Sequence, residues 1–167
     1  ADRDGRGGGE KVKVALLGPE GTYTHEAAMR YFNDLEPVFC STIAEVFESD
    51  VETRLVPFEN SLGGGVTDTI DRLHETENTI TGEQRLGINH CVLSNEDSLE
   101  DIDTVKSHPQ ALNQCRSFIE QHGFETEEAP STSEAAEDLA EGEAALASSA
   151  AAEVHNLKVV KTGVQDS

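Results

Sequence analysis

Short apolar clusters alternate with polar loops along most of the chain. The apolar run from Val12 to Leu17 ends at Gly18-Pro19, and we expect it to form a buried strand. Apolar residues at helical spacing follow from His25 to Phe32, with a threonine before them to cap the helix. The first unit is therefore a strand, a polar loop and a helix.

The same unit recurs through the rest of the chain. Further strands are predicted at 38–39, 54–58, 105–106, 144–147 and 158–161. Further helices are predicted at 42–49, 66–74, 109–121, in an alanine-rich stretch ending at Ala140, and at 150–154. Alternating strands and helices indicate an α/β fold with mainly parallel sheets. The extended stretch from Thr79 to Leu93 lacks a helix pattern, so we expect it to cross between two lobes.

Composition excludes several classes of partner. The 167 residues hold 12 Lys plus Arg and 33 Asp plus Glu, a formal net charge of −21. Such an excess argues against binding to nucleic acid and against docking on anionic membranes. We interpret the scattered carboxylates as an adaptation to high salt, the alternative being an ordinary acidic protein with a solvated surface.

The N-terminal residues and the cysteines suggest a cytoplasmic protein. Residues 1–11 are polar and glycine-rich, lack the apolar middle of a secretion signal, and are predicted to be a flexible leader. No apolar run is long enough to span a bilayer. Three cysteines without a CxxC pair favour free thiols over a disulfide framework or a zinc site.

Polar side chains gather in loops that follow a predicted strand and precede a predicted helix. They are Thr22, Asn60 with Ser61, Ser107 with His108, and Ser131 with Thr132. In open α/β sheets such loops meet at the carboxyl ends of the strands, where ligands bind. The N–H groups of the helix starts suit an anion, and these loops contain no Arg, so we expect a small carboxylate held by amides and hydroxyls.

Simpler interpretations of the same residues stay open. Each Ser, Thr or Asn is equally suited to capping a helix, and His108 to a structural hydrogen bond. Three glycines after Ser61 strengthen the ligand interpretation there, because they let a backbone approach closely. Gln114 lies seven residues after Ser107, so we expect both to face the same side of one helix.

At these loops the sequence resembles the prephenate dehydratase family. The motifs that carry the resemblance are Gly18 to Ala28, Val56 to Ser61 with Gly64 and Val66, Asp71 to Leu73, Ser107 to Cys115, Ser131-Thr132 with Ala135-Ala136, and Ala144 to Ser148 with Ala151 to Glu153. The resemblance implies two α/β lobes similar to type II periplasmic binding proteins, with the site in the cleft between them. It also implies conversion of prephenate to phenylpyruvate, water and carbon dioxide in phenylalanine biosynthesis, without a metal or cofactor.

The resemblance also implies roles for individual residues. Asn60, Ser107 and Gln114 match residues of the family's pocket, and Glu59 is a possible proton donor if burial raises its pKa, or else a structural carboxylate. The expected substrate-binding residues are Thr22, Ser61, Gly64, His108, Ser131, Thr132 and Ser148. His108 is the weaker candidate for the acid.

Family members carry a Thr-Arg-Phe motif, which supplies an acid Thr, and then an ACT regulatory domain; neither follows here before Ser167. We therefore expect a truncated catalytic region with weak or no activity. We place 12–80 and 159–167 in the first lobe and 81–158 in the second, and expect a homodimer or larger assembly of the parent. The rival functions are a bilobal small-carboxylate binder and a hydrolase with Ser107 or Ser61 as nucleophile.

Overall fold

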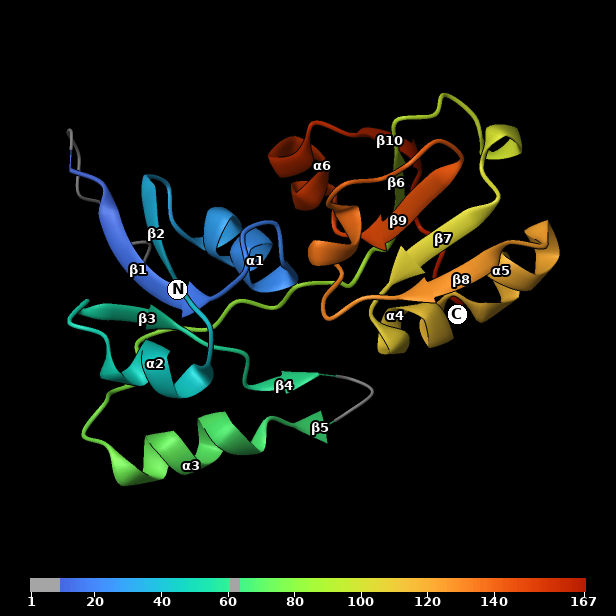
Figure 1. Cartoon of the computed structure of the whole chain (residues 1–167). Coiled ribbons are helices and arrows are strands. Elements are labelled where there is room, and N and C mark those ends of the chain that lie inside the picture. Colours follow the sequence, from blue (N-terminus) through green and yellow to red (C-terminus); the bar gives the residue numbers. More distant parts are fainter. Residues whose placement is uncertain (1–9, 61–63) are drawn as a thin grey trace. The chain divides into compact units, whose positions relative to one another are not determined.

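The computed structural model describes residues 10–60 and 64–167, so most of the predicted leader and Ser61 lie outside the described residues. The chain divides into two compact units (Figure 1). Of the described residues, unit 1 contains 10–18, 27–60 and 64–86, and unit 2 contains 19–26 and 87–167. The chain passes between the units within the stretch that was predicted to cross between lobes, at residues 86 and 87.

Unit 1 is built on a parallel sheet of three strands. They are β1 (Val12–Leu17), β2 (Leu35–Cys40) and β3 (Thr53–Leu55), in the order β2-β1-β3. Val14, Ala15 and Leu16 on the central strand are fully buried, as the apolar stretch predicted.

The remaining elements of unit 1 are short. They are α1 (Tyr23–Tyr31), whose first turn belongs to unit 2, α2 (Ile43–Glu48), β4 (Glu59–Asn60), β5 (Gly64–Gly65) and α3 (Thr67–Glu75). Thr42 caps α2 by accepting a hydrogen bond from the Glu45 amide at 3.1 Å. The strands β4 and β5 form a two-residue antiparallel ladder. The strand predicted over 54–58 ends at Leu55, and β4 and β5 follow it in the segment predicted as a loop.

Unit 2 contains a mixed sheet in the order β10-β6-β9-β7-β8. Its strands are β6 (Cys91–Ser94), β7 (Thr104–Ser107), β8 (Glu125–Glu128), β9 (Glu143–Ala147) and β10 (Lys158–Lys161). Its helices are η1 (Leu99–Asp101), α4 (Pro109–Gln114), α5 (Arg116–His122), η2 (Glu134–Ala136) and α6 (Ser149–His155). The strands β7, β8 and β9 are parallel, whereas β6 runs antiparallel to both β9 and β10.

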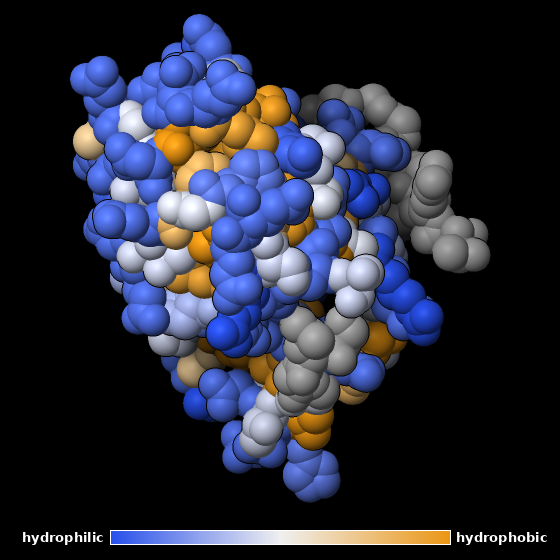
Figure 2. Space-filling model, turned by 90° about the vertical axis from the view of Figure 1, so that its right-hand side faces the viewer, coloured by the Kyte–Doolittle hydropathy of each residue, from blue (hydrophilic) through white to orange (hydrophobic). Residues whose placement is uncertain are grey.

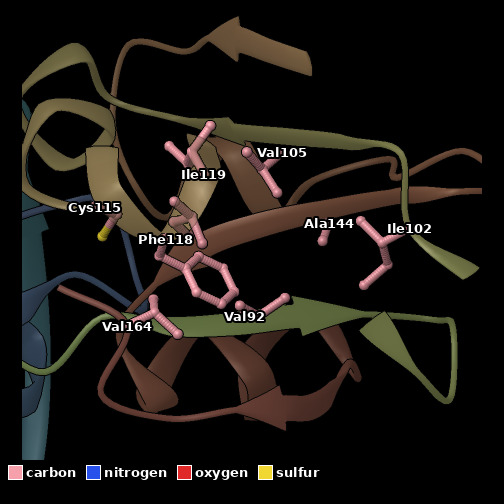
Figure 3. Close-up of a cluster of buried hydrophobic side chains, with 9 residues drawn as sticks. Val92, Ile102, Val105, Cys115, Phe118, Ile119, Ala144 and Val164 are labelled. Atoms are coloured by element: carbon pink, nitrogen blue, oxygen red, sulfur yellow. The ribbon is translucent and has the colours of Figure 1, made fainter. Parts of the chain in front are cut away.

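Alternating side chains of this sheet fill two separate cores. On one face, Val92 and Ala144 pack with Phe118 and Ile119 of α5 (Figure 3). On the other face, the alternate residues of β6 and β9 pack against small side chains of η2 and α6, among them Ala135 and Ala151. The alanines therefore let η2 and α6 approach the sheet closely.

Two predicted helices differ in the structure. The predicted helix over 109–121 is interrupted at Cys115, whose backbone leaves the helical region and whose N–H bonds to two carbonyls, those of Ala111 and Leu112. The predicted alanine-rich helix is a single 3₁₀ turn. Ser131 caps that turn as expected, but Glu137 adopts an extended backbone that ends the helical path, and Asp138 follows with a φ of 50°.

The division of the chain also differs from the prediction. Residues 159–167 were expected in the first lobe, but β10 pairs with β6 and belongs to unit 2. Residues 19–26 belong to unit 2 as well, although the strand before them lies in unit 1. The strand β10 belongs to unit 2 because its main chain pairs with a distant strand. Residues 19–26 belong to unit 2 because they make side-chain contacts with residues far away in the sequence. Among the described residues, no helix is long and apolar enough to cross a membrane.

Candidate functional site

Several of the predicted site residues lie at one edge of the unit 2 sheet. The parallel strands β7, β8 and β9 end at this edge, so Ser107, Ser131 and Ser148 lie at or just beyond their carboxyl ends. The antiparallel strand β6 begins there, because Cys91 pairs with Ala147. His90, which precedes β6, therefore joins the same edge.

Ser107 is the last residue of β7 and is fully buried. Its hydroxyl donates to the carbonyl oxygen of Leu146 at 2.6 Å. The prediction that Ser107 and Gln114 share one helical face is therefore wrong, because the helix begins only at Pro109 and Ser107 lies on the strand.

Four other predicted binding residues cap local structure. The Nδ1 atom of His108 accepts from the Gln110 amide at 3.1 Å, and the Oγ atoms of Ser131 and Ser148 accept from the amides three and two residues later. Thr22 Oγ1 accepts from the His25 amide at 3.3 Å. These contacts match the capping alternative. Thr132 is half-buried beside Ser131.

The segment 19–26, which comprises the loop after β1 and the first turn of α1, is held to the rest of unit 2 by polar contacts. The Ser133 hydroxyl donates to the carbonyl of Glu20, and the Ser148 hydroxyl donates to the carboxylate of Glu26. Gly21 has a φ of 85°, and a Cβ built there would lie 2.8 Å from Ser133 Oγ and 3.0 Å from Ala151 Cα. A glycine is therefore required at this turn.

Three side chains form a hydrogen-bonded chain at this edge. The Tyr23 hydroxyl bonds to Nδ1 of His90, and Nε2 of His90 lies 2.5 Å from Oε1 of Gln114. Burial raises the pKa of the Tyr23 hydroxyl and lowers the pKa of the His90 imidazole. Tyr23 therefore keeps its proton and His90 is neutral, since both charged forms are disfavoured by burial.

The main chain around His90 and Gln114 is held by the last described residues. The His90 amide donates to Gln165 Oε1 at 3.0 Å, and the His90 carbonyl accepts from the Val164 amide at 3.2 Å. The carbonyl of Gln114 accepts from the Asp166 amide at 2.6 Å. Residues 164–166 therefore fix the backbone on both sides of the His90–Gln114 contact.

The other predicted site residues lie in unit 1. Asn60 pairs with Gly64 in the β4–β5 ladder, and Glu59 pairs with Gly65. Glu59 is exposed, so the burial that would make it a proton donor is absent in the structure. Asn60 is exposed as well. Ser61, the remaining expected residue of this loop, lies outside the described residues.

Sequence reasoning missed Tyr23, His90 and Gln165. His90 precedes its strand, and only the antiparallel direction of β6 brings it to the edge where the other strands end. The pattern Tyr23-Thr24-His25 inside the first family motif was a usable signal, because a tyrosine at a helix start seldom lacks a partner when buried. Burial raises the pKa of the free Cys115 thiol to about 12, which leaves it unreactive.

The described residues contain no group of three or more His, Cys, Asp or Glu side chains placed to hold a metal ion. The candidate site is instead a set of neutral donors and acceptors: a phenol, an imidazole and an amide, with serine hydroxyls nearby. Such a site recognises a polar ligand by hydrogen bonds rather than by a cationic side chain.

The fold and this edge define an α/β protein of two units similar to type II periplasmic binding proteins, as predicted. A sequence model of the family described as Prephenate dehydratase matches residues 14–167, and the chain belongs to that family. A bifunctional chorismate mutase/prephenate dehydratase of Aquifex aeolicus is 39% identical over 168 residues, covering 95% of this chain and 46% of that protein. The chain spans about half the length of the curated relatives it matches.

Two solved structures are similar to this one. The prephenate dehydratase of Staphylococcus aureus subsp. aureus Mu50 has a TM-score of 0.81 and 30% identity, covering 93% of this chain and 61% of that chain. GqqA, described as a novel type of quorum quenching acylases, has a TM-score of 0.83 and 29% identity, covering 93% and 60%. The same fold thus occurs in proteins named for two different reactions.

Proposed function

We propose that this chain carries the catalytic region of a prephenate dehydratase, a carbon–oxygen lyase that converts prephenate to phenylpyruvate with loss of water and carbon dioxide. The family match over residues 14–167 carries the proposal. The reaction restores an aromatic ring, so the protein has chiefly to orient the substrate and assist departure of the hydroxyl group. We propose that no metal or organic cofactor takes part.

The neutral donors of unit 2 support this proposal. Prephenate carries two carboxylates, and the amide of Gln114 lies at the sheet edge with its oxygen occupied by His90. Its N–H groups make no hydrogen bond with another described residue, so they are available to a carboxylate. Asn60 is proposed as a second amide donor by its place in the family motif.

The similarity to GqqA makes amide hydrolysis the second candidate function. That reaction needs an activated nucleophile with a base in reach. Ser107 does not fit, because its hydroxyl is buried and donates to a main-chain carbonyl, and the neighbouring His108 accepts from a backbone amide with Nδ1. We therefore place the dehydratase first.

A direct assay separates three functions: dehydratase, acylase and non-catalytic carboxylate binder. Turnover of prephenate is followed by the appearance of phenylpyruvate, on this chain and on a longer chain that also carries a Thr-Arg-Phe motif, and binding is measured by calorimetry with phenylpyruvate. We expect phenylpyruvate to bind and the longer chain to turn over prephenate faster. Cleavage of an N-acyl amide with no prephenate turnover would establish the acylase, and binding without turnover by either chain would establish the binder.

Further proposals concern the setting of the protein. We propose a cytoplasmic, salt-adapted protein, supported by free buried thiols at Cys91 and Cys115 and by the net charge of −21. The face drawn in Figure 2 is mostly hydrophilic, with apolar atoms showing between the polar ones. We also propose, from the family resemblance, assembly into a homodimer or larger, which light scattering tests.

A further inference from the structure

We propose that His90 is a positioning residue that fixes the amide of Gln114 with its N–H groups directed to the ligand. The inference rests on the proposed function, in which Gln114 binds the substrate. His90 itself touches no reacting atom in this scheme. It acts through the hydrogen bond between its Nε2 atom and Oε1 of Gln114, 2.5 Å apart.

The positions of the hydrogens follow from the two partners of the His90 ring. The amide oxygen of Gln114 only accepts hydrogen bonds, so the hydrogen between it and His90 lies on Nε2. A neutral imidazole carries one hydrogen, so Nδ1 is an acceptor. The Tyr23 hydroxyl therefore donates to Nδ1 and holds the ring in this form.

This arrangement leaves Gln114 only one orientation of its amide. Rotation of the amide by half a turn would place its NH₂ group against the N–H of His90, and two donors would then face each other. The free side of Gln114 consequently presents donors and no acceptor. Such a group binds a carboxylate or a keto oxygen and discriminates against a donor such as an amine or amide N–H.

Both residues are anchored well enough for the contact to set an orientation. The amide and carbonyl of His90 bond to Gln165 and Val164, and the carbonyl of Gln114 bonds to Asp166. His90 is 2% exposed, and its ring meets Tyr23 edge to face with centroids 5.4 Å apart. A buried and doubly anchored ring gives the amide little freedom to turn.

Two substitutions at position 90 separate positioning from packing. In His90→Gln the side-chain nitrogen reaches the place of Nε2 and still donates to Gln114. In His90→Asn the shorter side chain replaces only the Nδ1 end of the ring. We expect His90→Asn to weaken phenylpyruvate binding about tenfold and His90→Gln less than threefold, since the lost orientation removes one hydrogen bond to a charged group.

Controls make the comparison decisive. His122→Asn, on an exposed ring at the end of α5, is the matched control and should leave binding unchanged, and thermal unfolding checks each variant for folding. Equal losses in His90→Asn and His90→Gln, or no loss in either, would overturn the proposal while the proposed function stands. If the unaltered chain fails to bind phenylpyruvate, the proposed function fails instead.

A measurement without ligand tests the hydrogen assignment itself. Nitrogen-15 NMR of the His90 ring distinguishes a hydrogen on Nε2 from one on Nδ1. We expect the Nε2 form in the unaltered chain and a mixture of both forms in Tyr23→Phe, which keeps the ring but removes the donor. A hydrogen on Nδ1 in the unaltered chain contradicts the proposal, whether or not the position 90 variants fold.

Discussion

The hydroxyl of Tyr23 is hydrogen-bonded to His90, 67 positions later in the chain, and the two rings meet at an interplanar angle of 76°. This contact connects the first residue of α1 with the residue before β6 inside unit 2. The polar edge of unit 2 is therefore assembled from segments that no local pattern connects.

Replacement of Gly21 by alanine should destabilise unit 2. The new Cβ would lie 2.8 Å from Ser133 Oγ in a backbone with a φ of 85°. We expect the free energy of unfolding to fall by about 2–4 kcal/mol, from backbone strain and overpacking together. Gly123→Ala is the matched control, with a φ of 68° and no atom near the added Cβ, and should cost only about 1–2 kcal/mol. Urea unfolding monitored by circular dichroism measures both, and equal losses would contradict the close approach at Gly21.

Substitution of the two proposed amide donors should weaken ligand binding. We expect Gln114→Ala and Asn60→Ala each to weaken phenylpyruvate binding about tenfold or more, because each removes a donor to a charged group. The exposed Gln121→Ala serves as a control on α5. Calorimetry on folded variants measures the affinities, and parental binding by either alanine variant would show that its amide has a structural role only.

The pair Lys106–Glu143 should make part of the stability depend on pH. The two side chains lie 2.8 Å apart and are 18% and 19% exposed. The hydrogen bond from Lys106 lowers the pKa of Glu143 below its ordinary 4.5, and the same bond raises the pKa of Lys106 above 10.5. The contribution of Glu143 is therefore complete above about pH 4.5 and is lost as pH falls through the lowered pKa.

Glu143→Gln tests this dependence. At pH 7 we expect the variant to lose about 1 kcal/mol of unfolding free energy, and in acid, below the lowered pKa, to match the unaltered chain. The contribution of Lys106 stays present below pH 10.5 and is lost as pH rises through its raised pKa. Glu141→Gln, on an exposed neighbour, is the control. A constant difference between pH 7 and acid would show that the ion pair is not the cause.

Salt should raise the unfolding temperature. The 33 acidic side chains outnumber the 12 basic ones, so the excess carboxylates repel one another at low ionic strength, and screening relieves that repulsion. We expect the melting temperature to rise steadily from low to molar sodium or potassium chloride. A melting temperature that stays flat or falls over this range would contradict the salt-adapted interpretation.

Local patterns predicted most of the elements. The apolar run of β1 is buried as a strand, and the alternation of strands and helices predicted the α/β class. What the patterns could not give was the direction and pairing of strands. Nothing local to Lys158–Lys161 shows that this strand pairs with β6, so it was predicted in the wrong lobe.

The candidate site was predicted in part for the same reason. The strand pattern placed Ser107 at the carboxyl end of a strand, where the structure has it, whereas Gln114 and Ser148 came from the family motifs. Their roles toward a ligand stay predictions. Ser131 caps a helical turn, as the capping alternative held, whereas the Ser107 hydroxyl donates to a main-chain carbonyl. His90 could not be predicted, because its place depends on β6 running opposite to β9.

The contacts that hold the segment 19–26 within unit 2 affect when this unit folds during synthesis. Its partners Ser133 and Ser148 follow Glu20 and Glu26 by 113 and 122 positions. At a synthesis rate of about 5–20 residues per second, the partners of segment 19–26 are translated about 6–25 seconds after the segment itself. Unit 2 must therefore complete its folding late, around a segment made early. A single proteolytic cut between Leu86 and Gly87 would separate residues 19–26 from the rest of unit 2, whereas unit 1 would stay on one fragment.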